Sequence, residues 1–351
     1  MTQTTVPAPT SSTPGAAREM PRQPMRLPAA LAAARLWRAA GGPAEVELGA
    51  LEPTLWRDSG LEIDGLISRL AQEGFRVNLT TNGSTLHRLA DRLGRCGLSR
   101  LRVSWHTTDP ALFRQITGFG EYARFERGIT RAAALGLPLA FNRLLFKDRC
   151  EDLPRQLDFI QHHGLRLKLY DLYWTPAIAA DYGRLYQPWA PVIRRHVLPR
   201  TARIERVRKA SGRSRLRFHL HGGGVVEVKL GSQVDRSAEP CRRCPFQKAC
   251  LESHGDYLRV DPRLQASLCY LRHDLAFPLD PAGGAGPLRA SLAARLGPAL
   301  PAFLRQGCLR LIIVPFCNQH CSLPGSAGTW CLKASGGYHY PRRERLPTPA
   351  P

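Results

Sequence analysis

The amino-terminal half of this 351-residue chain alternates short apolar runs with longer amphipathic segments, and this alternation limits the possible folds more than any other feature. Short runs rich in Val, Leu and Thr are typical of buried strands, and the segments between them have the apolar spacing of helices. Strands alternating with helices predict an α/β fold of parallel βα units, with functional residues at the carboxyl ends of the strands. The expected strands are 44–49, 76–81, 101–106, 139–146 and 165–172, and the expected helices are 63–73, 86–96, 110–135 and 153–163.

Three of the ten cysteines lie close together near the other end of the chain. They are Cys317, Cys321 and Cys331, spaced C-x3-C-x9-C, and they follow the apolar run 309–316, which we expect to be a further strand. Three thiolates on one loop can hold three irons of a [4Fe-4S] cluster and leave the fourth iron open for a small-molecule ligand. C-x3-C is also a tolerable spacing for zinc, so the loop alone leaves both metals open.

The cysteine loop and the strand ends together resemble the motifs of radical S-adenosylmethionine (SAM) enzymes. The loop is similar to their C-x3-C-x-aromatic-C motif, with Trp330 as the aromatic residue and with extra residues ahead of it. The segment 49–53, Gly-Ala-Leu-Glu-Pro, resembles the G-x-E-P segment that receives the amino group of SAM, with Ala and Leu in place of a second glycine. Ser104 and Asn142 stand at the ends of two further expected strands whose sequences resemble the same family.

The order of these motifs is unusual, because the cluster strand comes first in the family and last here. The resemblance therefore implies a circularly permuted, partial (β/α)6 TIM-like barrel over about residues 27–337, nearest to the GTP 3′,8-cyclases of molybdenum-cofactor biosynthesis. We expect strand 309–316 to lie parallel beside strand 44–49, and a helix near 31–40 to cover the pair.

The resemblance also implies a cofactor set and a reaction type. Cys317, Cys321 and Cys331 would hold the SAM-binding [4Fe-4S] cluster, whereas Gly49, Glu52, Ser104, Asn142 and Trp330 would line the SAM groove. Cleavage of SAM would give a 5′-deoxyadenosyl radical that abstracts hydrogen from a small-molecule, nucleotide-like or peptide substrate. The product would be cyclised, rearranged or cross-linked, and an external donor such as ferredoxin or flavodoxin would supply the electron.

A second group of cysteines predicts a second metal site. Cys241, Cys244 and Cys250 are spaced C-x2-C-x5-C, and Cys269 follows the expected strand 257–260. Four thiolates from two segments can hold a zinc ion or a second [4Fe-4S] cluster. These positions resemble the small, cysteine-rich auxiliary domain that follows the barrel in relatives. The expected organisation is a tail at 1–25, the main part of the barrel at 26–200, the auxiliary domain at 201–285, a connecting helix and permuted strand with its cluster loop at 286–340, and a tail at 341–351.

The net charge of +22 raises the question of nucleic-acid binding. Only six of the 50 basic residues are lysine, and the arginines are scattered along the helices, which favours an acidic or phosphate-bearing small substrate over nucleic acid. The sequence contains no run of 18 apolar residues, so we expect no membrane span. Clustered thiols indicate a reducing compartment, and hence the cytoplasm. Two alternatives stay open: a non-catalytic metal-binding module on a degenerate barrel, and an RNA-modifying radical SAM enzyme.

Overall fold

The computed structural model describes residues 24–118, 121–174, 180–208, 214–230, 238–247, 250, 254–269, 272–305, 309–315, 331–332 and 338–339. Eight strands in this part of the chain run parallel to their neighbours at the centre of one sheet. They are β1 (Glu45–Leu48), β4 (Arg76–Thr81), β5 (Leu98–Ser104), β6 (Leu139–Leu144), β7 (Arg166–Tyr170), β10 (Val225–Leu230), β11 (Tyr257–Val260) and β14 (Arg310–Ile313).

Antiparallel strands extend this sheet at both edges. They are β8 (Thr201–Arg208), β9 (Ser214–Leu220), β12 (Gln265–Ser267) and β13 (Phe277–Pro278). The complete order is β13-β12-β11-β14-β1-β4-β5-β6-β7-β10-β9-β8. Two short pairs lie outside the sheet: β2 (Arg57–Asp58) with β3 (Leu61–Glu62), and β15 (Cys331–Leu332) with β16 (Tyr338–His339).

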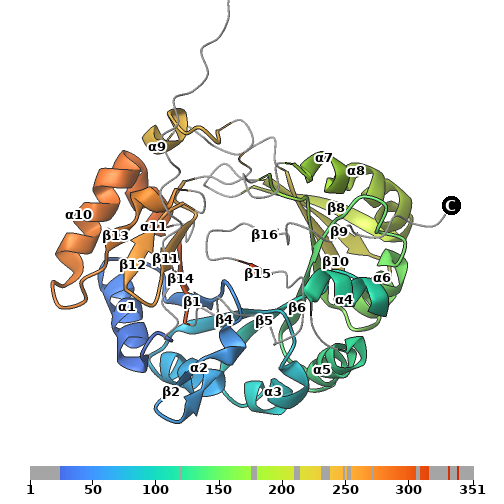
Figure 1. Cartoon of the computed structure of the whole chain (residues 1–351), viewed down its shortest axis with the longest axis horizontal. Coiled ribbons are helices and arrows are strands. Elements are labelled where there is room, and N and C mark those ends of the chain that lie inside the picture. Colours follow the sequence, from blue (N-terminus) through green and yellow to red (C-terminus); the bar gives the residue numbers. More distant parts are fainter. Residues whose placement is uncertain are drawn as a thin grey trace, which may run out of the picture.

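The helices lie on the outer side of the curved sheet, and the strands surround the middle of the molecule (Figure 1). The longer helices are α1 (Leu27–Ala39), α2 (Ile63–Gln72), α3 (Leu86–Leu93), α4 (Pro110–Thr117), α5 (Tyr122–Ala134), α6 (Leu153–His162) and α10 (Ala285–Leu296). Shorter helical turns are η1 (Pro53–Leu55), α7 (Tyr182–Leu185), α8 (Trp189–Val192), η3 (Ile193–Val197), η4 (Leu198–Arg200), α9 (Glu239–Arg242), η6 (His273–Leu275), η7 (Gly297–Ala299) and α11 (Leu300–Arg305).

The sheet has one apolar and one polar face because successive side chains of a strand point to opposite sides. Val77, Leu79, Val103 and Leu167 are completely buried beneath the helices, in the main core. The alternate positions carry polar and charged side chains that face the middle of the ring. We call this second surface the inner face.

The expected elements of the amino-terminal half agree with the structure to within a few residues. The exception is 110–135, expected as one helical region, which contains both α4 and α5. Gly118 ends α4 in a left-handed conformation with φ of +67°, which glycine adopts without strain.

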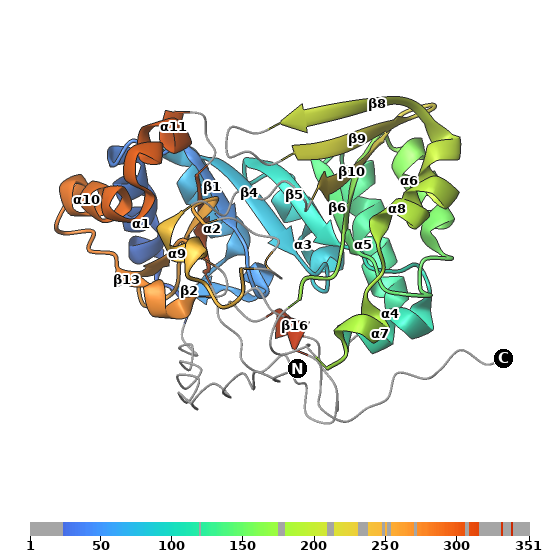
Figure 2. The ribbon, with the colours of Figure 1, turned by 90° about the horizontal axis from the view of Figure 1, so that it is seen from above.

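The predicted parallel pairing near the two ends of the chain is confirmed, because Val46 of β1 lies opposite Leu311 of β14. Helix α1, whose Ala30, Ala34 and Trp37 are buried, packs in the same core as these two strands. The strands within 201–285 also join the main sheet: β8 to β10 at one edge and β11 to β13 at the other (Figure 2). None of the described helices has the length and apolar character needed to cross a membrane.

Candidate active site

The carboxyl end of β14 lies beside the turn that follows β1. The amide of Gly49 donates to the carbonyl oxygen of Ile313 at 3.2 Å, and the amide of Met25 donates to that of Pro315 at 2.8 Å. The chain therefore enters the first cysteine motif at the edge of the sheet that carries the Gly49–Pro53 turn. Cys317, Cys321 and Trp330 lie outside the described residues. Cys331 opens β15, where its backbone pairs with His339.

The turn after β1 has a backbone that ordinarily suits glycine. Ala50 and Leu51 adopt φ values of +62° and +56°, and each such residue with a Cβ costs about 1–2 kcal/mol. Gly49 is not in this conformation, and a Cβ added to it would lie 3.5 Å from Cγ of Glu47, an ordinary contact. The positions that require glycine-like freedom are therefore 50 and 51, whereas the sequence pattern drew attention to Gly49.

Glu52 is buried and accepts four hydrogen bonds from the protein itself. Its Oε1 accepts from the amide of Thr54 at 3.1 Å, from the Thr54 hydroxyl and from the Thr81 hydroxyl at 2.7 Å, and its Oε2 accepts from the amide of Asn82 at 2.6 Å. Burial raises the pKa of this carboxyl above its ordinary value, and these hydrogen bonds offset only part of the rise. Glu52 thus ties the turn after β1 to the end of β4. A contact between Glu52 and the amino group of SAM stays a prediction.

Ser104, the last residue of β5, lies opposite Asn142, which is two residues before the end of β6. Their side chains share the inner face, because residues paired in register on neighbouring strands point to the same side. Oδ1 of Asn142 is buried without a hydrogen-bond partner. Buried polar atoms nearly always have partners, so this oxygen is placed to receive a ligand donor.

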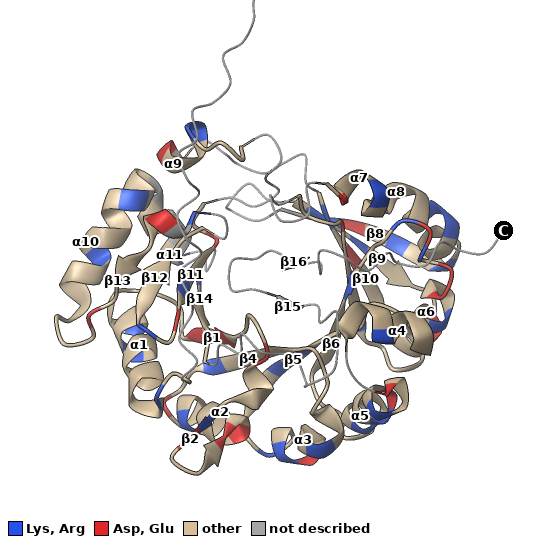
Figure 3. Cartoon of the chain, in the orientation of Figure 1, with Lys and Arg blue, Asp and Glu red and all other residues tan. Residues whose placement is uncertain are grey.

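Charged residues occur on several of the strands that surround the middle of the ring (Figure 3). Glu47 accepts from Arg102 at 2.6 Å and from the hydroxyl of Thr80. Burial alone would raise the pKa of Glu47, but Arg102, Thr80 and Arg310 outweigh it and hold the pKa below its ordinary value.

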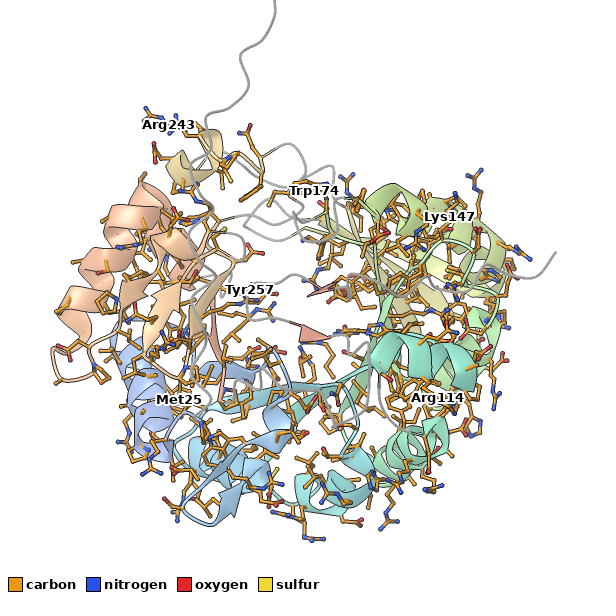
Figure 4. All side chains as sticks on the ribbon, in the orientation of Figure 1. Met25, Arg114, Lys147, Trp174, Arg243 and Tyr257 are labelled. Atoms are coloured by element: carbon orange, nitrogen blue, oxygen red, sulfur yellow. The ribbon has the colours of Figure 1, made fainter. Side chains whose placement is uncertain are left out.

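A second ionic group on the inner face is centred on Glu227 of β10. Its carboxylate accepts from Arg215 at 2.8 Å and from Arg217 at 3.2 Å. Lys168 of β7 lies nearby, and its pKa falls to about 8 because of burial and the repulsion of Arg215. Tyr257 of β11 and Arg102 of β5 also influence the pKa of Lys168, the first raising it and the second lowering it. In Figure 4 the Tyr257 side chain points toward the middle of the ring.

Comparison with known proteins gives matches to part of the chain. A model of the radical SAM superfamily matches residues 11–158. The GTP 3′,8-cyclase of Nitrobacter winogradskyi is 34% identical over 152 residues, which are 42% of this chain and 44% of that protein. The chain is thus similar to the radical SAM superfamily over residues 11–158. This match and these relatives indicate an enzyme.

Two further relatives have similar coverage. The GTP 3′,8-cyclase of Rhizobium meliloti is 36% identical over 142 residues, 40% of this chain and 39% of that protein. The probable GTP 3′,8-cyclase of Methanocaldococcus jannaschii is 33% identical over 132 residues, 37% of this chain and 43% of that protein. The chain thus spans less than half the length of each of these relatives.

The solved structures that match are more distant in sequence. Streptococcus suis SuiB bound to S-adenosylmethionine has a TM-score of 0.34 and 21% identity, covering 40% of this chain and 33% of that chain. Coproporphyrinogen III oxidase from Escherichia coli has a TM-score of 0.33 and 15% identity, covering 45% of this chain and 40% of that chain. These structures are too dissimilar to locate site residues in this chain.

The match to the radical SAM model implies a [4Fe-4S] cluster and SAM. The residues at the carboxyl edge fit SAM. The buried Oδ1 of Asn142 has no hydrogen-bond donor and can accept from a ligand, and Ser104 lies opposite Asn142 on the neighbouring strand. The direction of β14 fits the cluster, since it leads the chain to the same edge just before Cys317.

The second cysteine group is gathered in space. Burial raises the pKa of Cys241, and the thiols of Cys269, Cys250 and Cys244 raise it further, so each of these three thiols lies within electrostatic reach of Cys241. Among the described side chains, no three from His, Cys, Asp or Glu are arranged as a ready metal site. The second metal site stays a prediction.

A buried network behind the site was missed by sequence reasoning. Arg143, whose side chain is 0% exposed, donates to Asp152 at 2.5 Å on the helix-covered side of β6. Asp152 also accepts from the Thr107 hydroxyl at 2.8 Å and from the amide of Thr108. This network fixes the loop that follows Ser104. An arginine in an apolar strand was the available signal, because buried charge requires a partner.

Proposed function

We propose that this protein is a radical SAM enzyme whose reaction takes place at the carboxyl edge of the parallel strands. The observation that carries the proposal is the pairing of β14 with β1, which brings the end of β14, four residues before Cys317 in the sequence, beside the turn containing Glu52. The superfamily match does not include residues 309–331, so this spatial relation supports the assignment of the cysteine loop independently.

The order of elements in space supports a circular permutation of a partial (β/α)6 barrel. Strand β14 is followed in space by α1 and then by β1, since Met25, just before α1, is hydrogen-bonded to Pro315. A strand, a covering helix and a parallel strand form a βαβ unit. Here no direct covalent connection leads from β14 to α1, because β14 comes late in the sequence and α1 comes early. Circular permutation produces this arrangement.

The residues of the chain have the following proposed roles. Cys317, Cys321 and Cys331 hold the [4Fe-4S] cluster, and Gly49, Glu52, Ser104, Asn142 and Trp330 bind and orient SAM. When bound, the cluster and SAM supply a 5′-deoxyadenosyl radical for hydrogen abstraction. Cys241, Cys244, Cys250 and Cys269, within an auxiliary segment at 201–285, hold a second [4Fe-4S] cluster or zinc. Ferredoxin or flavodoxin supplies the electron in the cytoplasm.

The substrate is an acidic small molecule that binds over the inner face. Arg102, Arg215, Arg217 and Lys168 converge there, while Glu47 and Glu227 already accept hydrogen bonds from three of these side chains. The pKa of Lys168 is lowered chiefly by burial and then by the repulsion of Arg215, and an anionic ligand beside the ammonium group would stabilise its charge. Cyclisation, rearrangement and cross-linking are the candidate outcomes for this substrate.

Metal analysis and SAM cleavage test the proposal. Anaerobically reconstituted protein should contain about eight irons, and a Cys317→Ala, Cys321→Ala, Cys331→Ala variant about half as many. With dithionite and SAM, the wild-type protein should release 5′-deoxyadenosine slowly and the triple variant should release none. Cleavage by the triple variant would show that the cluster assignment is wrong.

A non-catalytic metal-binding module is the second candidate. It is favoured by the side chains at Ala50 and Leu51, where the family motif carries glycine and the backbone is left-handed. The same metal analysis separates the two candidates, because zinc without iron in both cysteine groups would exclude radical chemistry.

A further inference from the structure

His106 continues the inner face beyond Ser104, at the carboxyl end of β5. Trp105, between them, packs on the helix-covered side against Phe125, Phe141 and Phe159, with ring centroids 6.2, 5.0 and 5.4 Å away. Alternation along the strand therefore directs Ser104 and His106 to the opposite side. This is the side that carries the unpartnered Oδ1 of Asn142.

The backbone of β6 fixes the tautomer of His106. The amide of Leu144 donates a hydrogen bond to Nδ1 of His106 at 3.1 Å. An amide can only donate, so Nδ1 must accept, and the proton of the neutral ring lies on Nε2. No described residue accepts a hydrogen bond from this Nε2–H group.

We propose that His106 is a neutral hydrogen-bond donor to an oxygen acceptor of SAM, through Nε2–H, above Ser104 and Asn142. The site then offers SAM a donor from His106 and an acceptor from Asn142 on adjacent strands, so it recognises the orientation of the ligand as well as its presence. Burial and the charge of Arg143 lower the pKa of His106 to about 4, which keeps the ring neutral at physiological pH. The inference rests on the proposed function, since it assumes that SAM occupies this edge.

Two substitutions separate the ligand contact from the structural contact. In His106→Asn, the side-chain oxygen lies near the position of Nδ1 and can still accept from Leu144, but nothing reaches the position of Nε2. In His106→Gln, the longer amide reaches the position of Nε2 and can donate, while the Leu144 amide loses its acceptor. His106→Asn should therefore keep the stability of the wild-type protein and lose affinity for SAM. His106→Gln should keep the affinity for SAM and lose stability.

The affinity of anaerobically reconstituted protein for SAM, measured by equilibrium dialysis, tests this inference. His106→Asn should weaken binding about fivefold, whereas His106→Gln and the control His162→Asn, at an exposed histidine of α6, should stay within about twofold of wild type. Long-range proton–nitrogen spectra should show the Nε2–H form of His106 at neutral pH.

The outcomes distinguish this inference from the function on which it rests. Unchanged SAM affinity in His106→Asn, or a proton on Nδ1, would overturn the role of His106 and leave the proposed function standing. Absence of SAM binding by the wild-type protein would overturn both.

Discussion

The amide of Met25 donates a hydrogen bond to the carbonyl oxygen of Pro315 at 2.8 Å, although the two residues lie near opposite ends of the sequence. This bond joins the segment that leads into α1 to the end of β14. In the proposed circular permutation, residues in these places correspond to one continuous βαβ unit of the unpermuted order. The contact therefore predicts that the order of the chain can be changed without changing the fold.

A rearranged chain tests that prediction. Joining Pro351 to Met1 and opening the exposed turn near Gly283 would place α10, α11 and β14 ahead of α1. We expect the rearranged protein to have the far-UV circular dichroism, thermal transition and iron content of the original, because all strand pairings are retained. A protein that is folded but lacks the first cluster would contradict the proposed path of the cysteine loop.

The left-handed turn after β1 predicts stabilisation by glycine. Ala50→Gly and Leu51→Gly should each raise the free energy of unfolding by about 0.5–1 kcal/mol, because relief of backbone strain exceeds the added entropy of the unfolded chain. The control is Gly83→Ala, where φ is +79° and the new Cβ would lie 2.7 Å from Phe125, so the protein should be destabilised. Urea denaturation measures both effects. Destabilisation by both glycine variants would show that the turn is not strained.

The hydrogen bonds of Glu52 should stabilise the folded protein, in addition to the proposed role of Glu52 in binding SAM. Glu52→Gln replaces one accepting oxygen by an NH2 group that faces donors, so we expect a loss of about 1–3 kcal/mol in the free energy of unfolding. The exposed pair of Glu73 with Arg35 provides a control, and Glu73→Gln should cost less than about 1 kcal/mol. Because burial raises the pKa of Glu52, its contribution to stability is greatest at low pH and declines as the pH rises through the folded-state value. An unchanged urea midpoint in Glu52→Gln would contradict this network.

From the amino-acid sequence, the strands of the sheet could be predicted more accurately than the polar contacts between them. Alternating apolar runs locate β4 to within a residue, and the strongly apolar run 309–316 predicted a buried parallel strand because both faces of such a strand are covered. The break at Gly118 was missed, since one glycine does not determine where a helix ends. The tautomer of His106 depends on the Leu144 amide of another strand, and such contacts have no signature in the local sequence.

The buried ion pair of Arg143 and Asp152 predicts a large loss of stability when the carboxylate is removed. Asp152→Ala should cost about 3–5 kcal/mol because it leaves a fully buried guanidinium without its partner. The adjacent Glu151 pairs with Arg195 at 3.0 Å in an exposed position, so Glu151→Ala should cost less than about 1 kcal/mol. Equal losses in the two variants would show that burial of the pair does not matter.

The pH dependence of the same pair has a definite sign. Burial would raise the pKa of Asp152, but Arg143, Thr108 and Thr107 outweigh it and hold the pKa below its ordinary value. The stabilisation is therefore complete above about pH 4 and is lost as the pH falls through the folded-state pKa. Urea midpoints should be measured from about pH 3 to about pH 7, because carboxyl groups titrate in this range. As the pH falls, the midpoint of Asp152→Ala should decrease less steeply than that of wild type.

The inner face predicts binding of anions that depends on Lys168. Inorganic triphosphate is a suitable probe, and Lys168→Gln should weaken its binding about tenfold, because a buried ammonium forms a strong charge-assisted contact with phosphate. Lys147→Gln, at an exposed lysine outside the inner face, is the matched control and should bind as wild type does. Since the pKa of Lys168 is about 8, its positive charge is lost as the pH rises through that value, and wild-type affinity should fall between about pH 7 and 9. Isothermal titration at fixed ionic strength measures the affinities. Equal binding by both variants, or affinity that does not change across this pH range, would show that Lys168 does not contact the anion.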